Sequence, residues 1–522
     1  MRTFIIIIVI MLAQFFYKAD RVFANLLNIS NVALIPSTTA GAAIVEFDIS
    51  WENSWRNSVN HDAVWVFVKY KTKTEDWAHA SLTTSGINPS GYSRGTGTTI
   101  SIDVAHLGGS TRKGCFISRT NVGYGTVDTD DIQLLWDYNT DGVSDTDVID
   151  EIKVLGVEMV YIPEGNFIIG DGNGSGESTY AFHVASDSGV HITSDSASDV
   201  VADSGGLDDA TLVVDGIGID GDDGLDIDNN GIWALFGGTD NLYFPTGWQD
   251  SYMMKYEISQ GQYSDFLNLL PDAQAANRYD NSTYGTYRYT IDTDYSVDRE
   301  DRACVYLSWM DTAAFCDWAA LRPMSELEFE KAARGTDASV LGEYAWGNSS
   351  INGAEAGEIS ESPERGSEQI TDADANACYS TVSFTSGDSG SGPLRVGIFA
   401  ESSTNRVTSG ASYYGVMELS GNVWEMAVSL GGDSGRRYRG EGDGTLHSTG
   451  NSDETSWPGY TAESGVYTAG GVGFRGGAWN SGTTAPRTSN RSNATTSTCV
   501  LTRCGSVGGR CVRSYTDYGA LE

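Results

Sequence analysis

The stretch from Gly473 to Arg513 most constrains how this chain can fold, because it is long and almost lacks side chains that could form a core. It contains paired glycines, a single tryptophan at Trp479, a run of small hydroxyl and amide residues, and three cysteines toward its end. Gly, Ser, Thr and Asn favour irregular backbone, and their side chains bond ligands or their own main chain. We therefore expect a long surface-exposed segment that the rest of the chain carries as a scaffold.

Length and charge limit the classes of protein that this chain can belong to. Its 522 residues exceed one ordinary hydrophobic core, and a chain of this size suggests roughly two to four domains. The 70 Asp and Glu residues outnumber 32 Lys and Arg, so the formal net charge is −38 at pH 7. Nucleic-acid binding is not expected, because it requires a basic surface for the phosphates. The same charge favours divalent cations.

Residues 1–24 have the pattern of a secretory signal peptide. Arg2 precedes an apolar run from Phe4 to Phe16, and the small residue Ala24 stands at the expected cleavage point. The apolar run is shorter than the ~20 residues that a membrane-spanning helix needs. We expect an exported protein that is secreted or held at the cell surface or in the periplasm, without a transmembrane span after removal of the signal. An uncleaved anchor is the alternative.

Export makes disulfides possible, since the compartments outside the cytosol are oxidising. The chain has seven cysteines, so at least one is unpaired or pairs between chains. None of them forms a close CxxC pair, and only six His are present. A zinc site of the usual ligand spacing is therefore not expected.

Residues 25–153 are predicted to form a β-sandwich of immunoglobulin or fibronectin type. Short strand-like runs alternate there with clusters of Gly, Asn, Ser and Asp. The runs are AAIVEFDISW, AVWVFVKY, TTISIDV, GCFISRTN and DIQLLWDY. The segment from Asp137 to Asp145 also resembles the start of a calcium loop. However, Val148 stands where such a loop has a bidentate Glu, so a plain acidic turn is the alternative.

An acidic insertion at about residues 173–245 interrupts the second part of the chain, residues 154–522. No Lys or Arg occurs from Val154 to Met254, while Asp alternates with Val, Ile and Leu between Asp203 and Asp228. One interpretation is a solvated insertion with one or two β-hairpins. The other is an insertion ordered by calcium, because uncompensated carboxylates repel one another unless a cation intervenes.

Three capping boxes predict short helices in the second part of the chain. A capping box is a Ser whose side chain and the residue three positions later satisfy each other's backbone N–H groups. The pairs are Ser259 with Gln262, Ser308 with Asp311, and Ser325 with Glu328; Pro271 ends the first helix and Gly335 the third. These helices lie among many Gly, Ser and Asn residues. We therefore expect an α+β domain with much irregular loop.

Seven segments in this order resemble the formylglycine-generating enzyme family, the sulfatase-modifying factor domain. The resemblance covers about Val157 to Arg513, with the acidic insertion as an interruption. It implies a C-type-lectin-like fold with small sheets, two or three helices and long ligand-bearing loops. The segments are VEMVYIPEGNFIIG, MMKYEISQGQYSDFLN, YLSWMDTAAFCDWAALRPMSELEFEKAARG, EYAWGN, YGVMELSGNVWEM, GFRGGAW and GGRCVR.

The resemblance implies two structural features. The first is a disulfide between Cys316 and Cys511. The second is a structural calcium site whose ligands correspond to Glu418, Gly421, Val423 and Glu425. Oxygens that converge from a tight turn suit this hard cation. The family's enzymes have an amide where Glu418 stands, so the type of ligand differs. A packing motif in which Trp424 fills the core is the alternative.

The family's copper chemistry does not carry over to this chain. The enzymes oxidise a cysteine of the substrate with copper held by two thiolates, and the corresponding positions are Ser481 and Pro486. Neither side chain can replace a thiolate as a ligand for this soft ion. Cys499 and Cys504 have the same spacing farther along the chain. They form a relocated copper site or a small loop disulfide, or one of them pairs with Cys304 or Cys378.

These observations favour a secreted, non-catalytic binding or surface-assembly protein. The partner would be an extracellular glycan or protein, or the chain itself. One alternative is a metal-dependent oxidase or other enzyme of the family with an altered site. Another is a ligand-binding protein diversified by a retroelement, because such proteins resemble this chain after FRGGAW. The predicted ligand-binding surface consists of Trp479, Asn480, Ser481, Thr483, Thr484, Arg487, Asn490 and Arg491.

Overall fold

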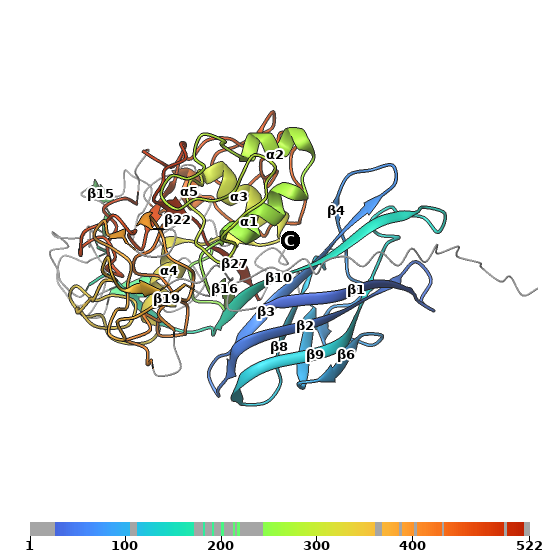
Figure 1. Ribbon diagram of the computed structural model, residues 1–522, viewed down its shortest axis with the longest axis horizontal. Helices are drawn as coiled ribbons and strands as arrows, with labels where there is room; N and C mark the ends of the chain where they lie inside the picture. Colours follow the sequence, from blue (N-terminus) through green and yellow to red (C-terminus); the bar gives the residue numbers. More distant parts are fainter. Residues whose placement is uncertain are drawn as a thin grey trace, which may run out of the picture.

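The computed structural model describes residues 27–104, 112–171, 244–360, 368–385, 389–400, 404–430, 433–494 and 498–515, together with residues 181–182 and four short strands between residues 190 and 219. The predicted signal peptide and most of the acidic insertion lie outside these residues. The described part is mostly sheet with a few short helices (Figure 1).

A four-stranded antiparallel sheet forms one layer of the N-terminal part. Strand β2 alternates along its length, with Val45, Phe47, Ile49 and Trp51 buried on one face. This period of two is what a sheet with one solvated face requires. The strand order is β1 (Asn28–Pro36), β2 (Ala43–Arg56), β9 (Gly123–Trp136) and β6 (Ser93–Gly97).

The second layer is a nine-stranded sheet that continues into the C-terminal part of the chain (Figure 1). Strand β10 (Ile149–Ile162) crosses the predicted boundary between residues 153 and 154 without a break. It pairs with β3 on one side and with β16 on the other. The order is β17 (Arg322–Pro323), β27 (Cys511–Ser514), β16 (Ser251–Met254), β10, β3 (Asp62–Thr72), β8 (Cys115–Arg119), β7 (Ile100–Val104) and β5 (Gly86–Ile87), with β4 (Ala78–His79) beside β3.

Strand β3 belongs to two hydrophobic cores. Val64, Val66 and Val68 face the four-stranded sheet and pack in the N-terminal core. Trp65 and Phe67 point the other way and pack with side chains of the C-terminal part. A strand covered on both faces has few polar residues, which explains the unbroken apolar run AVWVFV. The two parts of the molecule are therefore joined by a shared sheet and not by a linker.

All three predicted capping boxes are confirmed. In each, the Ser side chain accepts a hydrogen bond from the N3 backbone, and the N3 side chain accepts one from the Ser backbone. A helix that was not predicted, α2, begins directly after Pro271. The helices are α1 (Gln260–Asn268), α2 (Asp272–Arg278), α3 (Trp309–Trp318), α4 (Glu326–Arg334) and α5 (Asp433–Arg436).

The other strands of the C-terminal part form small separate sheets between long loops. A three-stranded sheet has β22 (Trp424–Val428) between β25 (Val472–Arg475) and β26 (Val507–Gly508). The described strands of the insertion pair antiparallel with one another or with β11, which precedes it. They are β12 (Val190–Ile192) with β11 (Phe167–Ile169) and β13 (Val200–Ala202), and β14 (Leu212–Val214) with β15 (Ile217–Ile219). The remaining pairs are β18 (Ile359–Ser360) with β19 (Gln369–Ile370), β20 (Ser383–Phe384) with β21 (Gly390–Ser391), and β23 (Tyr460–Thr461) with β24 (Gly465–Val466).

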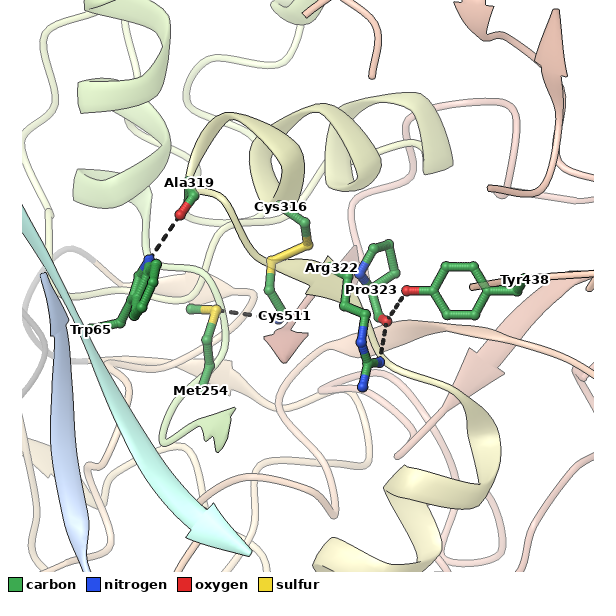
Figure 2. The surroundings of a disulfide bond; sticks show 8 residues. All are labelled: Trp65, Met254, Cys316, Ala319, Arg322, Pro323, Tyr438 and Cys511. Carbon is green, nitrogen blue, oxygen red and sulfur yellow. Dashed lines mark hydrogen bonds between the residues drawn. A yellow bond between two sulfur atoms is a disulfide. The ribbon is translucent and has the colours of Figure 1, made fainter. Parts of the chain in front are cut away.

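The Cys316–Cys511 disulfide is confirmed and joins α3 to β27 across 195 residues (Figure 2). Residues of both the N-terminal and the C-terminal part lie around this disulfide. The Cys511 N–H donates to the sulfur of Met254 at 3.2 Å, and Trp65 Nε1 donates to the carbonyl of Ala319 at 2.8 Å. The disulfide thus fixes α3 against the shared sheet at the place where the N-terminal part docks.

Candidate functional site

The loop that follows β25 crosses over the turn that precedes β22. Gly476 and Gly477 have φ values of 89° and 73°, a left-handed conformation that glycine adopts without strain. The carbonyl of Gly476 accepts a hydrogen bond from Gly421 N–H at 2.8 Å. Trp479 N–H then donates to the carbonyl of Asn422 at 2.8 Å. Two segments that resemble family motifs, GGAW and GNVWE, are thus held together by main-chain bonds.

Ser481 and Pro486 lie on this loop and offer no ligand for copper. Ser481 Oγ accepts a hydrogen bond from Ala478 N–H at 3.0 Å. Pro486 is buried, and its carbonyl accepts a hydrogen bond from Ser420 Oγ at 2.7 Å. The copper site that the resemblance implies needs two thiolates at these positions, and neither residue supplies one.

The other cysteines do not provide paired thiolates either. Cys499 and Cys504 form a disulfide, so the expected small loop disulfide is the pairing observed. Cys115, Cys304 and Cys378 are free and buried. Burial raises the thiol pKa of each of the three above its usual value, which keeps them protonated and unreactive.

The expectation of a surface-exposed segment from Gly473 to Arg513 needs correction, because much of it is interior. Arg475, Thr488, Ser489 and Arg510 are at most 1% exposed. The predicted ligand-binding surface is correspondingly smaller than the sequence suggested. Of its eight residues, Asn480, Thr483 and Thr484 are exposed, Ser481 and Arg487 are half-buried, and Trp479, Asn490 and Arg491 are buried.

Arg491 points inward because a carboxylate on α4 pairs with it. Its Nε and Nη2 lie 2.6 and 2.7 Å from the two oxygens of Glu326, and its guanidinium lies 3.9 Å from the ring centroid of Phe182. Burial would raise the carboxyl pKa of Glu326, but Arg491 and Arg475 lower it below the usual value. Such bidentate pairs are strong and directional. Arg491 therefore holds the loop onto α4 and is not available to a ligand.

Two of the predicted calcium ligands, Glu418 and Glu425, lie in a buried group of three carboxylates with Glu257. Glu257 accepts hydrogen bonds from Val423 N–H at 2.9 Å and from the Asn422 side chain at 2.5 Å. Glu418 accepts one from Gly397 N–H at 2.8 Å. Glu425 accepts two from Arg510, at 3.0 and 2.6 Å. The group is therefore arranged around the turn that contains the other two predicted ligands, Gly421 and Val423.

The negative charge of this group is not fully compensated. Burial is the main cause that raises all three carboxyl pKa values, that of Glu418 to about 7, and Arg510 opposes the shift in each. Among the described residues, the buried second oxygens of Glu418 and Glu425, Oε2 in each, have no hydrogen-bond partner. Leaving buried carboxylate oxygens without a partner costs free energy. Carboxylate oxygens of this kind are the ligands that a hard cation such as calcium prefers.

A different acidic group has the closest spacing in the described part of the chain. Ligand atoms of Asp317, Asp443 and Asp453 lie within 4.8 Å of one another. Asp317, on α3, accepts hydrogen bonds from Asp443 N–H at 3.1 Å and from Ser452 Oγ at 2.7 Å. These bonds join α3 to the loop that precedes β23.

The acidic segment near Asp137 forms a hydrogen-bonded turn. Asp141 accepts hydrogen bonds from Ser81 N–H at 2.8 Å, Ser81 Oγ at 2.6 Å and Trp136 Nε1 at 2.7 Å. Asp137 accepts from the backbone and side chain of Thr140. These bonds tie the turn to the end of β9.

Sequence reasoning did not assign roles to Glu257, Arg510 and Tyr287. Glu257 and Arg510 occur in segments that resemble the family, MMKYEISQGQYSDFLN and GGRCVR. Their place in these motifs could have marked them as candidates for a site. Tyr287 lies outside those segments and gave no signal. Its ring centroid lies 5.0 Å from that of Trp479 and half of the residue is exposed, so it is a candidate for ligand contact.

A known family model matches the C-terminal part of the chain. The family model FGE-sulfatase, described as the sulfatase-modifying factor enzyme 1-like domain, matches residues 245–515, more than half of the chain. No curated protein matches the chain at a significant level. The described residues contain no helix with the length and hydrophobicity needed to cross a membrane.

Proposed function

Since this chain belongs to the family of sulfatase-modifying factor enzyme 1-like domains, we propose that it is an exported, non-catalytic binding or assembly protein. The observation that carries the proposal is the pair Ser481 and Pro486. By the resemblance, these residues correspond to the two copper-binding cysteines of the family's enzymes, while the motifs that build the scaffold remain. The two disulfides support export, because such bonds persist mainly in oxidising compartments.

The non-catalytic role is tested with the reaction of the family's enzymes. Purified full-length protein is incubated with Cu(I), oxygen and a peptide that contains CxPxR, and formylglycine is measured by mass spectrometry. We expect no product and no stoichiometric Cu(I) binding, because no pair of free thiols is accessible to the ion. A protein that binds one equivalent of Cu(I) and converts the peptide would refute the proposal.

A double variant, Ser481→Cys with Pro486→Cys, is the matched comparison. If the loop retains the geometry of the family, two thiols at these positions should increase Cu(I) binding over the unmodified chain. A Cys499→Ser, Cys504→Ser variant addresses the altered-enzyme alternative. An unchanged copper content in this second variant would exclude a relocated site on that disulfide.

We also propose that calcium binds at the turn before β22. Its ligands would be the carboxylates of Glu418 and Glu425 and the main-chain carbonyls of Gly421 and Val423. The buried Oε2 atoms of Glu418 and Glu425, which have no hydrogen-bond partner, support this assignment. Bound calcium would compensate the buried charge and brace the turn beneath Trp479, so its role would be structural.

Calcium binding predicts a specific pattern of thermal stability. Excess CaCl2 should raise the Tm above its value in EGTA, since ligand at about 100 times Kd stabilises by roughly 2.7 kcal/mol. Glu418→Gln should abolish this difference without lowering the Tm in EGTA, because it removes a buried charge together with a ligand. Glu463→Gln, at an exposed position, is the control. Equal Tm values of the unmodified chain in CaCl2 and EGTA would contradict the assignment.

A further inference from the structure

Three aromatic residues, Tyr287, Tyr306 and Trp479, form an aromatic platform beside the loop that carries Ser481. The ring centroid of Tyr287 lies 5.0 Å from that of Trp479 and 6.3 Å from that of Tyr306. Tyr287 is 48% exposed, whereas Trp479 is 3% exposed. Trp479 therefore supports the ring of Tyr287 from the interior, and Tyr287 presents its ring to solvent.

The backbone around Gly505 fixes this platform. The carbonyl of Gly505 accepts a hydrogen bond from Trp479 Nε1 at 2.9 Å. A Cβ atom on Gly505 would lie 2.1 Å from Cδ2 of Tyr287, so the ring of Tyr287 packs where a side chain would otherwise be. The carbonyl of Cys504 accepts a hydrogen bond from Tyr306 N–H at 3.1 Å. Cys504 also forms the disulfide with Cys499. This disulfide restrains the backbone at Cys504 and Gly505, against which the platform packs.

Three residues at the platform have left-handed backbone. The φ values are 47° at Tyr287, 62° at Tyr306 and 54° at Thr381, although such values are uncommon for residues other than glycine and unfavourable for bulky ones. Thr381 belongs to the site, because its N–H donates to the carbonyl of Trp479 at 2.8 Å. Strained residues of this kind persist where surrounding structure enforces them, and they cluster at ligand sites.

Four of the exposed side chains next to the platform are polar and uncharged. Thr286 Oγ1 and the Tyr306 hydroxyl lie 2.7 Å apart, and Thr381 Oγ1 lies 3.4 Å from the carbonyl of Asn480. Four neighbours of the platform, Thr286, Ser380, Thr381 and Asn480, are exposed. These four side chains carry no charge, although the whole chain has a net charge of −38, so they are unsuited to recognising a ligand by its charge. Hydroxyl and amide groups beside an open aromatic ring suit a ligand with hydroxyls and an apolar face.

We propose that the aromatic platform binds a neutral glycan. The C–H face of a hexose ring stacks on the exposed ring of Tyr287, and the sugar hydroxyls bond to Thr381 and Asn480. This inference rests on the proposed binding function and specifies its ligand class. It also gives Trp479 a new role: the buried indole orients Tyr287 and does not itself contact the ligand.

Titration of the full-length protein with neutral hexose oligosaccharides tests the proposal. The probes are hexamers of β-linked glucose, α-linked glucose, mannose and galactose, with binding followed by calorimetry. We expect at least one hexamer to bind, and Tyr287→Asn to weaken it by about ten-fold through loss of ring stacking. Asn is chosen because it tolerates left-handed backbone. Tyr287→Phe keeps the ring and should retain most of the affinity.

Two further variants separate binding from folding. Asn480→Ala changes an exposed side chain and should weaken binding several-fold at an unchanged Tm. Tyr467→Asn removes a ring that is 59% exposed elsewhere on the molecule and should have no effect. The proposal is overturned if no hexamer binds, if Tyr287→Asn binds like the Tyr467→Asn control, or if a peptide and not a sugar binds through Tyr287. None of these results would show that the protein is a copper enzyme. The formylglycine assay therefore tests the non-catalytic role independently of the glycan proposal.

Discussion

At the scale of single residues, buried ionisable side chains set the behaviour of this protein. Arg491, Arg475 and Arg510 are fully buried and paired with carboxylates of α4 or β22. Removing one partner of such a pair leaves a buried charge unpaired, which is strongly destabilising. Arg491, which the sequence suggested for ligand contact, is thus committed to the scaffold.

His61 allows a residue-scale prediction about pH. Its ring stacks on Tyr161 at a centroid distance of 5.0 Å, and its Nε2 lies 3.0 Å from the hydroxyl of Tyr252. Burial, and secondarily Arg56, lowers its pKa to about 3. Between pH 6.5 and 3 the unfolded chain binds a proton at His61 that the folded protein does not, so acid removes stability in this window.

His61→Gln should remove that part of the pH dependence. Relative to the variant, the unmodified protein should lose at most roughly 1.4 kcal/mol of unfolding free energy per pH unit as the pH falls from 6.5 toward 4. Urea denaturation of both proteins at several pH values measures this difference. A difference that stays constant with pH would show that His61 does not contribute.

At the scale of elements, short helices and small sheets depend on links between distant segments. Helix α3 has ten residues, too few for stability by itself in water. The Cys316–Cys511 disulfide attaches it to β27, and Trp65 of β3 donates to the carbonyl directly after it. Such links compensate for the lack of long regular structure.

The two disulfides should differ in their contribution to stability. The chain-entropy model gives roughly 5 kcal/mol for a closed loop of the length spanned by Cys316 and Cys511, and roughly 2 kcal/mol for the short Cys499–Cys504 loop. Paired Cys→Ser variants of each bond, compared by urea denaturation, measure both values. An equal loss in the two variants would argue against the loop-length explanation.

At the scale of the whole molecule, the nine-stranded sheet joins the N-terminal and C-terminal parts. Lys69 of β3 reaches across and donates to the carbonyls of Trp318 and Gly444 at 2.7 and 3.0 Å. Trp65 packs against Phe116 and under the guanidinium of Arg513. Neither part can lose its fold without exposing the buried strand β3.

We therefore expect one cooperative calorimetric transition for the full chain. Trp65→Phe removes the donor to Ala319 and leaves a buried carbonyl without its partner, which costs about 1–3 kcal/mol. It should lower the Tm of that single transition without splitting it. Trp77→Phe, at a partly exposed position in the N-terminal part, should have a much smaller effect. Two separate transitions in the unmodified protein would contradict the shared-sheet interpretation.

The sequence by itself determined the features that depend on neighbouring residues or on motif order. The capping boxes depend on residues three positions apart, and the order of the motifs led to the family and to the Cys316–Cys511 bond. Only the tertiary structure decided that β10 continues from one part of the molecule to the other. It likewise decided that Arg491 points inward, because its partner Glu326 lies 165 residues away. Local hydrogen bonds can be predicted from the sequence because they join residues close together in the chain. Burial and side-chain direction cannot, because they depend on which distant segments the fold brings together.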